Sequence, residues 1–240
     1  KRQALSYDKN LNSAKIELIN IYLETFNLRD LKSFNNFINE IGLSRNDQIY
    51  NLLTFFYLDS SPKKQYLRAL NFSRKNYKED SLKIKSELNN NLIRIGYISA
   101  NFNNHPVSKI METIFKNHDE SKFELFAYSL NSFEDDITQN LKKYFKKFTN
   151  IGKLNILEIV SLIRADKLNI AIDLMGYTKR NKIAIFNKRV APIQINYLGF
   201  AGTSGSKNID YLLADKYVIP KSYKRYYSEK IIYMPNSFIN

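Results

Sequence analysis

Leu92–Ala100 reads LIRIGYISA, and the residues that follow, Asn101–Pro106, read NFNNHP. The first stretch is a short apolar run rich in β-branched residues, which predicts a buried strand. The second is polar and ends in proline, which favours the first turn of a helix because no N–H is needed there. A helix is therefore expected from about Val107 to Lys116. A strand, a loop at its carboxyl end and a helix together form the repeating unit of a parallel α/β sheet.

The same alternation continues through the rest of the chain. Further apolar runs predict strands at residues 123–130, 148–151, 169–174, 193–198, 211–214 and 230–234. Between them the pattern predicts helices at 134–147, 155–166 and near 180–187. Strands that alternate with helices favour an α/β fold, a doubly wound parallel sheet with helices on both faces and right-handed crossovers. We assign this Rossmann-like domain to residues 91–240.

Residues 1–88 have a different, helical pattern. Apolar side chains recur every three or four positions along 16–26 and again along 31–41, where the run stops at Gly42. A third helix is expected from about Asp47 to Leu58, and Ser61-Pro62 starts a fourth. Helices of this kind are typical of the end of a helical repeat array or of a connector to the next domain.

Composition excludes several classes of protein. The chain has 240 residues, 44% hydrophobic and 25% charged, which is typical of a soluble globular protein. No stretch is long and apolar enough to cross a membrane, so no membrane association is expected. The absence of cysteine excludes disulfides and thiolate chemistry and agrees with a reducing, cytoplasmic location. With only two histidines, His105 and His118, no metal centre of imidazoles is expected.

The net charge of +14 raises the question of nucleic-acid binding. The basic residues are spread over both the helical part and the α/β part rather than concentrated in one of them. This distribution favours a solvated basic surface, so we regard nucleic acid as an unlikely partner.

Ligands of open parallel sheets bind beyond the carboxyl ends of the strands, where the strand order reverses. Three loops of this sequence follow strands directly and hold polar or glycine residues. Each loop has two interpretations. It either binds a ligand, or its residues are structural: a histidine that caps a helix in the first loop, a buried carboxylate in the second and tight glycine turns in the third. His118 lies in a polar stretch away from the strand ends and is not expected to function. The candidate residues in the three loops are His105 and Pro106, then Asp173, Gly176, Tyr177 and Thr178, then Gly202, Thr203 and Ser204.

Taken together and in order, these segments resemble the first catalytic lobe of glycosyltransferase family 41, the protein O-GlcNAc transferases, in a bacterial-type form. The most specific of the matching stretches is residues 171–205, because the order and spacing of its residues match over more than thirty positions. The helical segment LTFFYLDSSPKKQYLRALNFSRKNY resembles the connector between tetratricopeptide repeats and the catalytic region. The matching stretches of the lobe are IRIGYISANFNNHPVSK, FELFAYSL, AIDLMGYTKRNKIAIFNKRVAPIQINYLGFAGTSG, IDYLLAD and YSEKIIYMPNSF.

The resemblance implies a GT-B fold and transfer of N-acetylglucosamine from UDP-GlcNAc to Ser or Thr hydroxyls of a protein or peptide acceptor. It implies an inverting mechanism without metal or cofactor. His105 matches a histidine considered catalytic or substrate-orienting, and Asp166 matches an aspartate that matters for activity. Asn169 stands where animal members of the family have a histidine. The Gly176–Thr178 and Gly202–Gly205 loops match segments that face the donor sugar or the acceptor.

The family's second lobe supplies the residues that hold UDP, and this sequence stops at Asn240 before any such lobe. We therefore expect little or no transferase activity from residues 1–240 alone. An alternative with the same fold is a SPINDLY-type transfer of fucose from GDP-fucose. A second is a non-catalytic module that binds protein or nucleic acid. A dehydrogenase is disfavoured because the glycine fingerprint is missing from the first loop.

Overall fold

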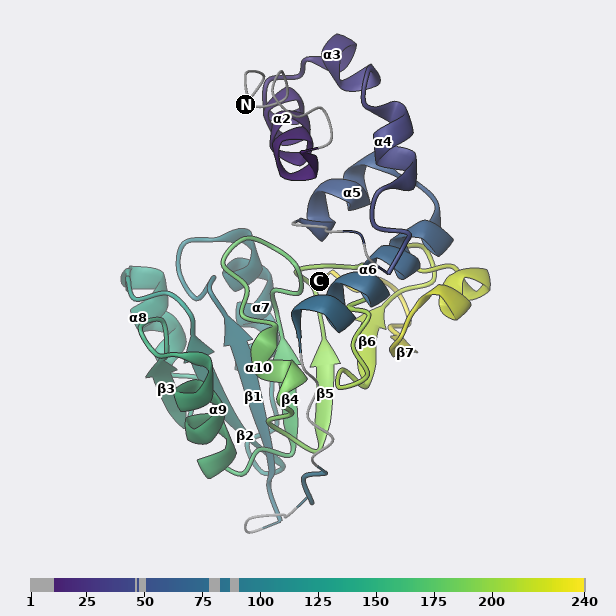
Figure 1. Ribbon diagram of the computed structural model, residues 1–240. Coiled ribbons are helices and arrows are strands. Elements are labelled where there is room, and N and C mark those ends of the chain that lie inside the picture. The colour runs from purple at the N-terminus through teal and green to yellow at the C-terminus, as the bar shows by residue number, and fades with distance from the viewer. Residues whose placement is uncertain (1–10, 46, 48–50, 78–82, 87–90, 240) are drawn as a thin grey trace.

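The computed structural model describes residues 11–45, 47, 51–77, 83–86 and 91–239 (Figure 1). A group of helices from the first part of the chain lies above one end of a β-sheet, and the last of them, α6, lies against the sheet-containing part. Among the described residues, no helix has the length and apolar character needed to span a membrane. The chain changes from helices to strands between Asn76 and Ile93.

The helical part largely follows the predicted pattern, with local differences. The run at 31–41 forms two short helices rather than one, and it ends before Gly42, whose φ of +80° confirms the predicted glycine stop. The third helix begins at Leu52, not near Asp47, because the Asp47 carboxylate instead accepts the N–H groups of Gly42 and Ser44. The helices are α2 (Asn12–Glu24), α3 (Leu28–Lys32), α4 (Asn35–Glu40), α5 (Leu52–Leu58) and α6 (Pro62–Asn76).

The predicted parallel sheet is confirmed. It has seven strands in the order β3-β2-β1-β4-β5-β6-β7, and every neighbouring pair is parallel. The order reverses between β1 and β4, which is the point where such sheets open a crevice. The strands are β1 (Ile93–Ser99), β2 (Phe123–Ser129), β3 (Lys147–Asn150), β4 (Ile170–Asp173), β5 (Ile193–Asn196), β6 (Tyr211–Ala214) and β7 (Lys230–Tyr233).

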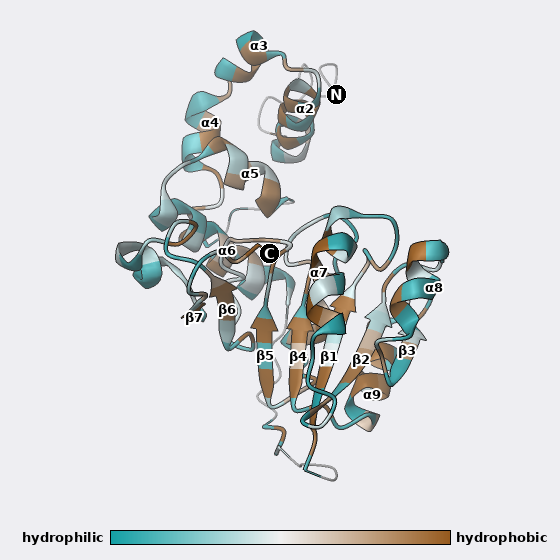
Figure 2. Ribbon diagram, turned by 180° about the vertical axis from the view of Figure 1, so that it is seen from behind, coloured by the Kyte–Doolittle hydropathy of each residue, from teal (hydrophilic) through white to brown (hydrophobic). Residues whose placement is uncertain are grey.

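Helices cover both faces of the sheet, as predicted. The helix expected at 134–147 ends at Lys142, because β3 already begins at Lys147, and the one expected at 180–187 is a single turn at its end. Figure 2 shows hydrophobic residues concentrated in the central strands. The helices of the lobe are α7 (Pro106–Lys116), α8 (Asp136–Lys142), α9 (Ile156–Ala165), α10 (Ala184–Asn187) and the 3-10 helix η1 (Lys221–Tyr226).

Alternate side chains of a strand point to opposite faces, so Tyr97 and Ile98 of β1 belong to two hydrophobic clusters. Tyr97 packs with Met111 of α7, and Ile98 lies in the cluster that holds Ile163 of α9. The second of these clusters also contains buried residues of the helical part, such as Phe55. The helices and the lobe therefore share one hydrophobic core.

Arg68 of α6 ties the helical part together. Its guanidinium is fully buried and donates to the carbonyl oxygens of Ile38 and Ile41 and to the carboxylate of Asp59 at 2.7 Å. On the other side of α6, Gly205 approaches so closely that a Cβ there would come within 2.3 Å of the Ala69 backbone. This close contact fixes α6 over the glycine-rich loop that follows β5.

Candidate active site at the carboxyl edge of the sheet

The loops that follow β1 and β4 meet at the point of strand reversal. The sulfur of Met175 accepts hydrogen bonds from the backbone N–H of Ala100 at 3.3 Å and from the side chain of Asn101 at 3.5 Å. The loop after β5 joins them, because a Cβ on Gly176 would lie 2.4 Å from Cβ of Phe200. All three predicted loops therefore lie side by side on one edge, which we call the carboxyl rim.

His105 is the N-cap of α7, and its partly exposed ring lies on this rim. Nδ1 accepts the backbone N–H of Val107 at 3.2 Å, and Pro106 occupies the first turn. A ring nitrogen that accepts an N–H carries no proton, so the neutral ring carries its proton on Nε2. No partner of Nε2 is recorded among the described residues. His105 is thus set up to donate a hydrogen bond at the positive end of a helix.

Asp173 ends β4 and is buried at 2% exposure. Its two carboxylate oxygens accept the backbone N–H groups of Met175 at 2.9 Å and Gly176 at 3.1 Å. Burial raises the pKa of Asp173 to about 6, although these two hydrogen bonds act in the opposite direction. The geometry agrees with a carboxylate that shapes the loop. Direct contact with a ligand stays a prediction.

Gly176 has a φ of +55°, a conformation that L-residues with a side chain adopt only with strain. The turn it allows aims Tyr177 inward, where the hydroxyl donates to the carbonyl oxygen of Ser204 at 2.6 Å. Thr178 remains partly exposed, and its hydroxyl donates to the carbonyl oxygen of Met175. Thr178 is therefore the member of this loop best placed to meet a ligand.

The Gly202–Ser204 loop is organised by Glu229, a residue for which no function was expected. The buried Glu229 carboxylate accepts the hydroxyl of Thr203 at 2.8 Å and the backbone N–H of Ser204 at 2.7 Å, and also the Ser204 hydroxyl. Burial raises the pKa of Glu229, and these hydrogen bonds oppose the increase. Thr203 and Ser204 are at most 4% exposed, so their hydroxyls serve this cluster in the structure.

Asp166 lies at the amino ends of the strands, on the side of the sheet opposite the carboxyl rim. It is the C-cap of α9, and its carboxylate binds Lys147 at the start of β3 and accepts the hydroxyl of Tyr128. Arg94, near the start of β1, donates to its carbonyl oxygen. The seven residues of β1 separate this edge from the His105 loop by about 20 Å. The structure does not bring Asp166 and His105 together, and a catalytic role of Asp166 stays a prediction without geometric support.

Asn169 and His118 also lie away from the carboxyl rim. Asn169 precedes β4, where its side chain accepts the backbone N–H of Arg94 and donates to Ser86. His118 follows α7, and its ring contacts the hydroxyl of Tyr97 at 2.8 Å. His105 is therefore the one histidine of the chain on the rim.

The sequence profile described as Glycosyl transferase family 41 matches residues 69–240. The chain belongs to this family. Among curated relatives of family 41, the chain is 37% identical over 158 residues to a probable UDP-N-acetylglucosamine–peptide N-acetylglucosaminyltransferase, SEC, of Arabidopsis thaliana. It is 34% identical over 152 residues to the corresponding transferase of Caenorhabditis elegans. It is 32% identical over 151 residues to another Arabidopsis protein, SPINDLY, which is also named a probable UDP-N-acetylglucosamine–peptide N-acetylglucosaminyltransferase.

These family 41 relatives are much longer than the chain. The matched regions cover 65%, 62% and 61% of this chain but only 16%, 13% and 16% of the SEC, C. elegans and SPINDLY proteins. A solved structure of an O-GlcNAc transferase mutant from Thermobaculum terrenum superposes with a TM-score of 0.72 at 24% identity. It covers 78% of this chain and 37% of that one. This likeness confirms that the lobe has the fold of a GT-B family 41 enzyme.

A hollow of about 680 Å³ lies beside the carboxyl rim of this family 41 lobe. One wall comes from the helical part, including Glu24, Thr54 and Tyr57, and the other from the loop after β4, including Thr178 and Arg180. We call it the helix–lobe hollow. It is large enough for several side chains of a peptide, and its walls carry both charged and aromatic groups.

Proposed function

We propose that the chain is the first catalytic lobe of a protein O-GlcNAc transferase, which transfers N-acetylglucosamine from UDP-GlcNAc to Ser or Thr hydroxyls of proteins. Family membership and the names of the SEC and C. elegans relatives support this substrate pair. The observation that carries the proposal is the position of His105, on the carboxyl rim at the reversal of strand order, with Nε2 free to bind.

His105 acts in this proposal as a hydrogen-bond donor. Because Val107 occupies Nδ1, Nε2–H is the group that can reach a sugar, phosphate or acceptor oxygen. The N-terminus of α7 adds a positive field at the same place, which stabilises negative charge on such an oxygen. A ¹⁵N NMR spectrum of the ring tests this directly. A neutral ring with the proton on Nδ1 would contradict the assigned role.

The acceptor polypeptide approaches through the helix–lobe hollow in this proposal. The hollow borders Thr178, the partly exposed end of the Asp173–Thr178 loop, whose other members are buried. The hydrogen bond shown for the His105 ring comes from an uncharged backbone N–H, and we assign the neutralisation of a diphosphate leaving group to a second lobe. Transfer therefore requires both lobes, with His105 facing the cleft between them.

The helical part is, in this proposal, the end of a tetratricopeptide array or its connector in a bacterial-type, cytoplasmic enzyme. In the helical part α2 contacts α3 and α5 contacts α6, and its buried residues share a core with the lobe, which agrees with a rigid connector. Upstream coding sequence with a period of about 34 residues would support the array. Recovery of the full-length product in a membrane or secreted fraction would contradict the location.

The alternative donor is GDP-fucose, used by a SPINDLY-type enzyme of the same fold. The Arabidopsis SPINDLY relative is named a probable UDP-N-acetylglucosamine–peptide N-acetylglucosaminyltransferase, so its name favours the first proposal. The decisive experiment supplies the full-length gene product and an acceptor extract with radiolabelled UDP-GlcNAc in one reaction and GDP-fucose in another. Label in protein from UDP-GlcNAc alone supports the first proposal. Label from GDP-fucose alone selects the second, and label from neither contradicts both.

A further inference from the structure

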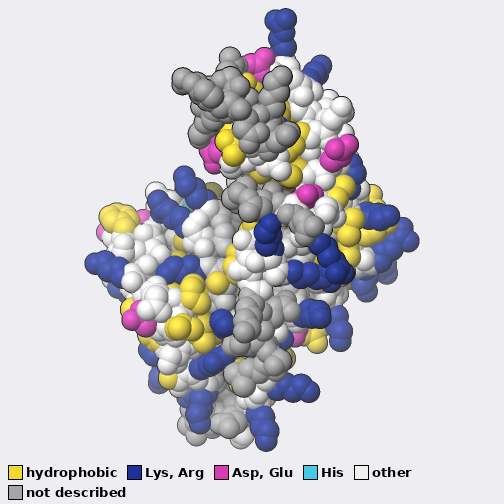
Figure 3. Space-filling view, in the orientation of Figure 1, with side chains coloured by type: hydrophobic (Ala, Val, Ile, Leu, Met, Phe, Trp, Pro, Cys, Tyr) yellow, Lys and Arg dark blue, Asp and Glu magenta, His cyan; other side chains and the backbone are white. Residues whose placement is uncertain are grey.

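A basic and aromatic surface lies at the β7 edge of the sheet, away from His105. The segment from Lys216 to Ser228 reads KYVIPKSYKRYYS and contains no acidic residue. Its helix η1 packs against α6. Figure 3 shows Lys and Arg side chains gathered at the side of the molecule where η1 lies. We call residues 216–228 the basic-aromatic segment.

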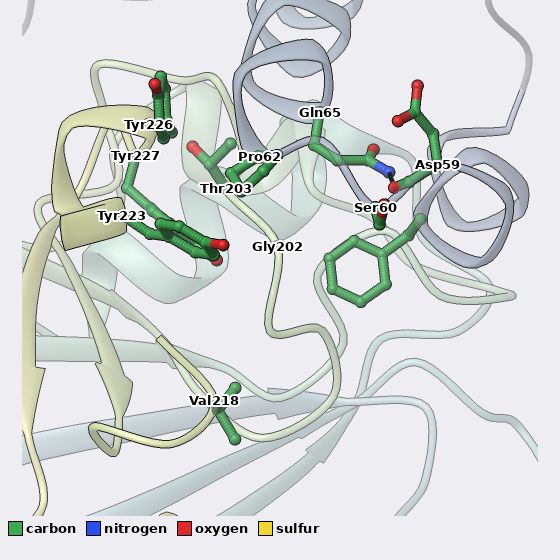
Figure 4. Close-up of a pocket in the computed structure, with 11 residues that line it drawn as sticks. Asp59, Ser60, Pro62, Gln65, Gly202, Thr203, Val218, Tyr223, Tyr226 and Tyr227 are labelled. Atoms are coloured by element: carbon green, nitrogen blue, oxygen red, sulfur yellow. Dashed lines mark hydrogen bonds between the residues drawn. The ribbon is translucent and has the colours of Figure 1, made fainter. Parts of the chain in front are cut away.

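A cavity of about 180 Å³ lies between this segment and the start of α6. Tyr223 and Tyr227 approach it from the basic-aromatic segment, Pro62 and Gln65 from α6, and the backbone of Gly202 passes between them (Figure 4). A cavity of about 150 Å³ in another protein holds a benzene molecule. One aromatic or branched aliphatic side chain therefore fits here.

The cations of the basic-aromatic segment are available to a partner. Lys224 lies over the ring of Tyr233 at 5.7 Å, and Arg225 lies over that of Tyr226 at 4.9 Å. No ion pair of either cation is recorded in the described part of the chain. Both side chains are exposed, and Tyr223 is 42% exposed beside them. Lys224 and Arg225 lie between Tyr223 and Tyr226 in the chain, and both tyrosines line the cavity, so these exposed cations give the surface beside it a positive potential.

The acidic residue that lines the cavity does not cancel this potential. Asp59 binds Arg68 at 2.7 Å and Lys64 at 3.8 Å, and its side chain is only 8% exposed. Its pKa is lowered by the Ser61 N–H and by these two cations, against a large opposing effect of burial. Its charge is thus already neutralised by basic groups from α6.

We propose that this surface docks an acidic polypeptide segment that places one apolar side chain in the cavity. The carboxylates of the segment pair with Lys224 and Arg225, and the apolar side chain packs among Tyr223, Tyr227 and Pro62. The geometry disfavours single-stranded nucleic acid, because the rings of Tyr223 and Tyr226 are tilted by 62° and offer no stack for successive bases. The inference needs no transfer chemistry and stands independently of it.

Fluorescence anisotropy tests the proposal on the 240-residue chain at low ionic strength, where surface charges are least screened. The probe is a labelled peptide rich in Glu and Asp with one central Phe. The comparison probes replace that Phe by Ala, or all Glu and Asp by Gln and Asn, and a labelled oligo-dT is the nucleic-acid probe. We expect saturable binding of the acidic Phe peptide, tighter than that of each comparison probe.

Two variants locate the site. Replacing Lys224→Glu together with Arg225→Glu should weaken binding of the acidic peptide by about tenfold. Tyr223→Ala should weaken binding of the Phe peptide but not of its Ala version, because only the first fills the cavity. The control is Lys143→Glu with Lys146→Glu, two exposed residues beside β3 at the other edge of the sheet. Circular dichroism confirms that each variant is folded.

The outcomes separate the alternatives. Weaker binding of the acidic Phe peptide by the Lys224→Glu, Arg225→Glu variant, with little change in the Lys143→Glu, Lys146→Glu control, supports the proposal. An equal loss of affinity in both double variants would show unspecific attraction of the peptide to a basic protein and overturn the proposal. Tighter binding of oligo-dT than of the acidic peptide would also overturn it, as would the absence of saturable binding.

Discussion

Ser204 donates its backbone N–H to Oε1 of Glu229 at 2.7 Å, across 25 positions of the chain. The same carboxylate accepts the hydroxyls of Ser204 and Thr203, so one buried charge holds the whole glycine-rich turn after β5. This relationship gives the Gly202–Ser204 loop a fixed shape without any ligand. It also explains why two hydroxyls that suggest substrate binding point inward.

Ser204→Ala should lower the free energy of unfolding by about 2 kcal/mol, because the buried Glu229 carboxylate loses a hydroxyl partner. Urea denaturation at neutral pH measures the change. Ser222→Ala is the matched control, since Ser222 is exposed and should change stability by less than about 0.5 kcal/mol. A Ser204 variant as stable as the control would show that the hydroxyl is dispensable for the loop and free for another role.

Asp173 should make the stability of the chain pH-dependent. Burial raises its pKa from 3.8 to about 6, so the folded state binds the proton more tightly than the unfolded state. Stability from this group is present at low pH and is lost as pH rises through the range from about 4 to about 6, by roughly 3 kcal/mol for a shift of this size. Denaturation across this range measures it.

The comparison variant is Asp173→Asn, whose side chain does not titrate. Between pH 4 and pH 7 it should lose roughly 3 kcal/mol less stability than the unsubstituted chain. The two chains should therefore differ in the pH dependence of unfolding, whatever the offset between them at low pH. Identical pH profiles of the two chains would mean that Asp173 keeps an ordinary pKa in the folded state.

Arg68→Ala should destabilise the chain by about 3–5 kcal/mol, because removal of the buried guanidinium takes the donor from two backbone carbonyls and leaves the Asp59 carboxylate with only the Ser61 N–H and the more distant Lys64. Thermal or chemical unfolding measures this loss. Arg74→Ala on the same helix is the control, and its exposed side chain predicts a change below about 0.5 kcal/mol. Similar effects of the two substitutions would contradict the assigned role of Arg68.

Much of the fold is predictable because parallel strands carry a strong local signal. The apolar run at 92–100 and its successors predict the strands, and strands separated by helices predict parallel pairing. Parallel strands end at the same edge, so the three loops could be assigned to one rim from sequence alone. What the pattern cannot give is strand order, which places the β1 and β4 loops beside each other.

The contacts that define the site were less predictable, because they join residues far apart in the chain. Glu229 precedes β7 in an ordinary polar turn, and nothing in its local sequence connects it to Thr203. Asp166 illustrates the opposite case. A residue just before a strand lies at the amino edge of a parallel sheet, so its distance from His105 follows from its sequence position alone.

The central claim is that His105 contributes to transfer from the carboxyl rim through Nε2–H. The most direct test is the turnover of the full-length gene product carrying His105→Ala, with His118→Gln as the control in a histidine away from the rim. We expect kcat to fall by about 100-fold or more in the first variant, because a positioned hydrogen-bond donor at a catalytic centre is worth roughly that factor. The second variant should keep its turnover, and both should remain folded. Unchanged turnover in a folded His105→Ala protein would contradict the claim.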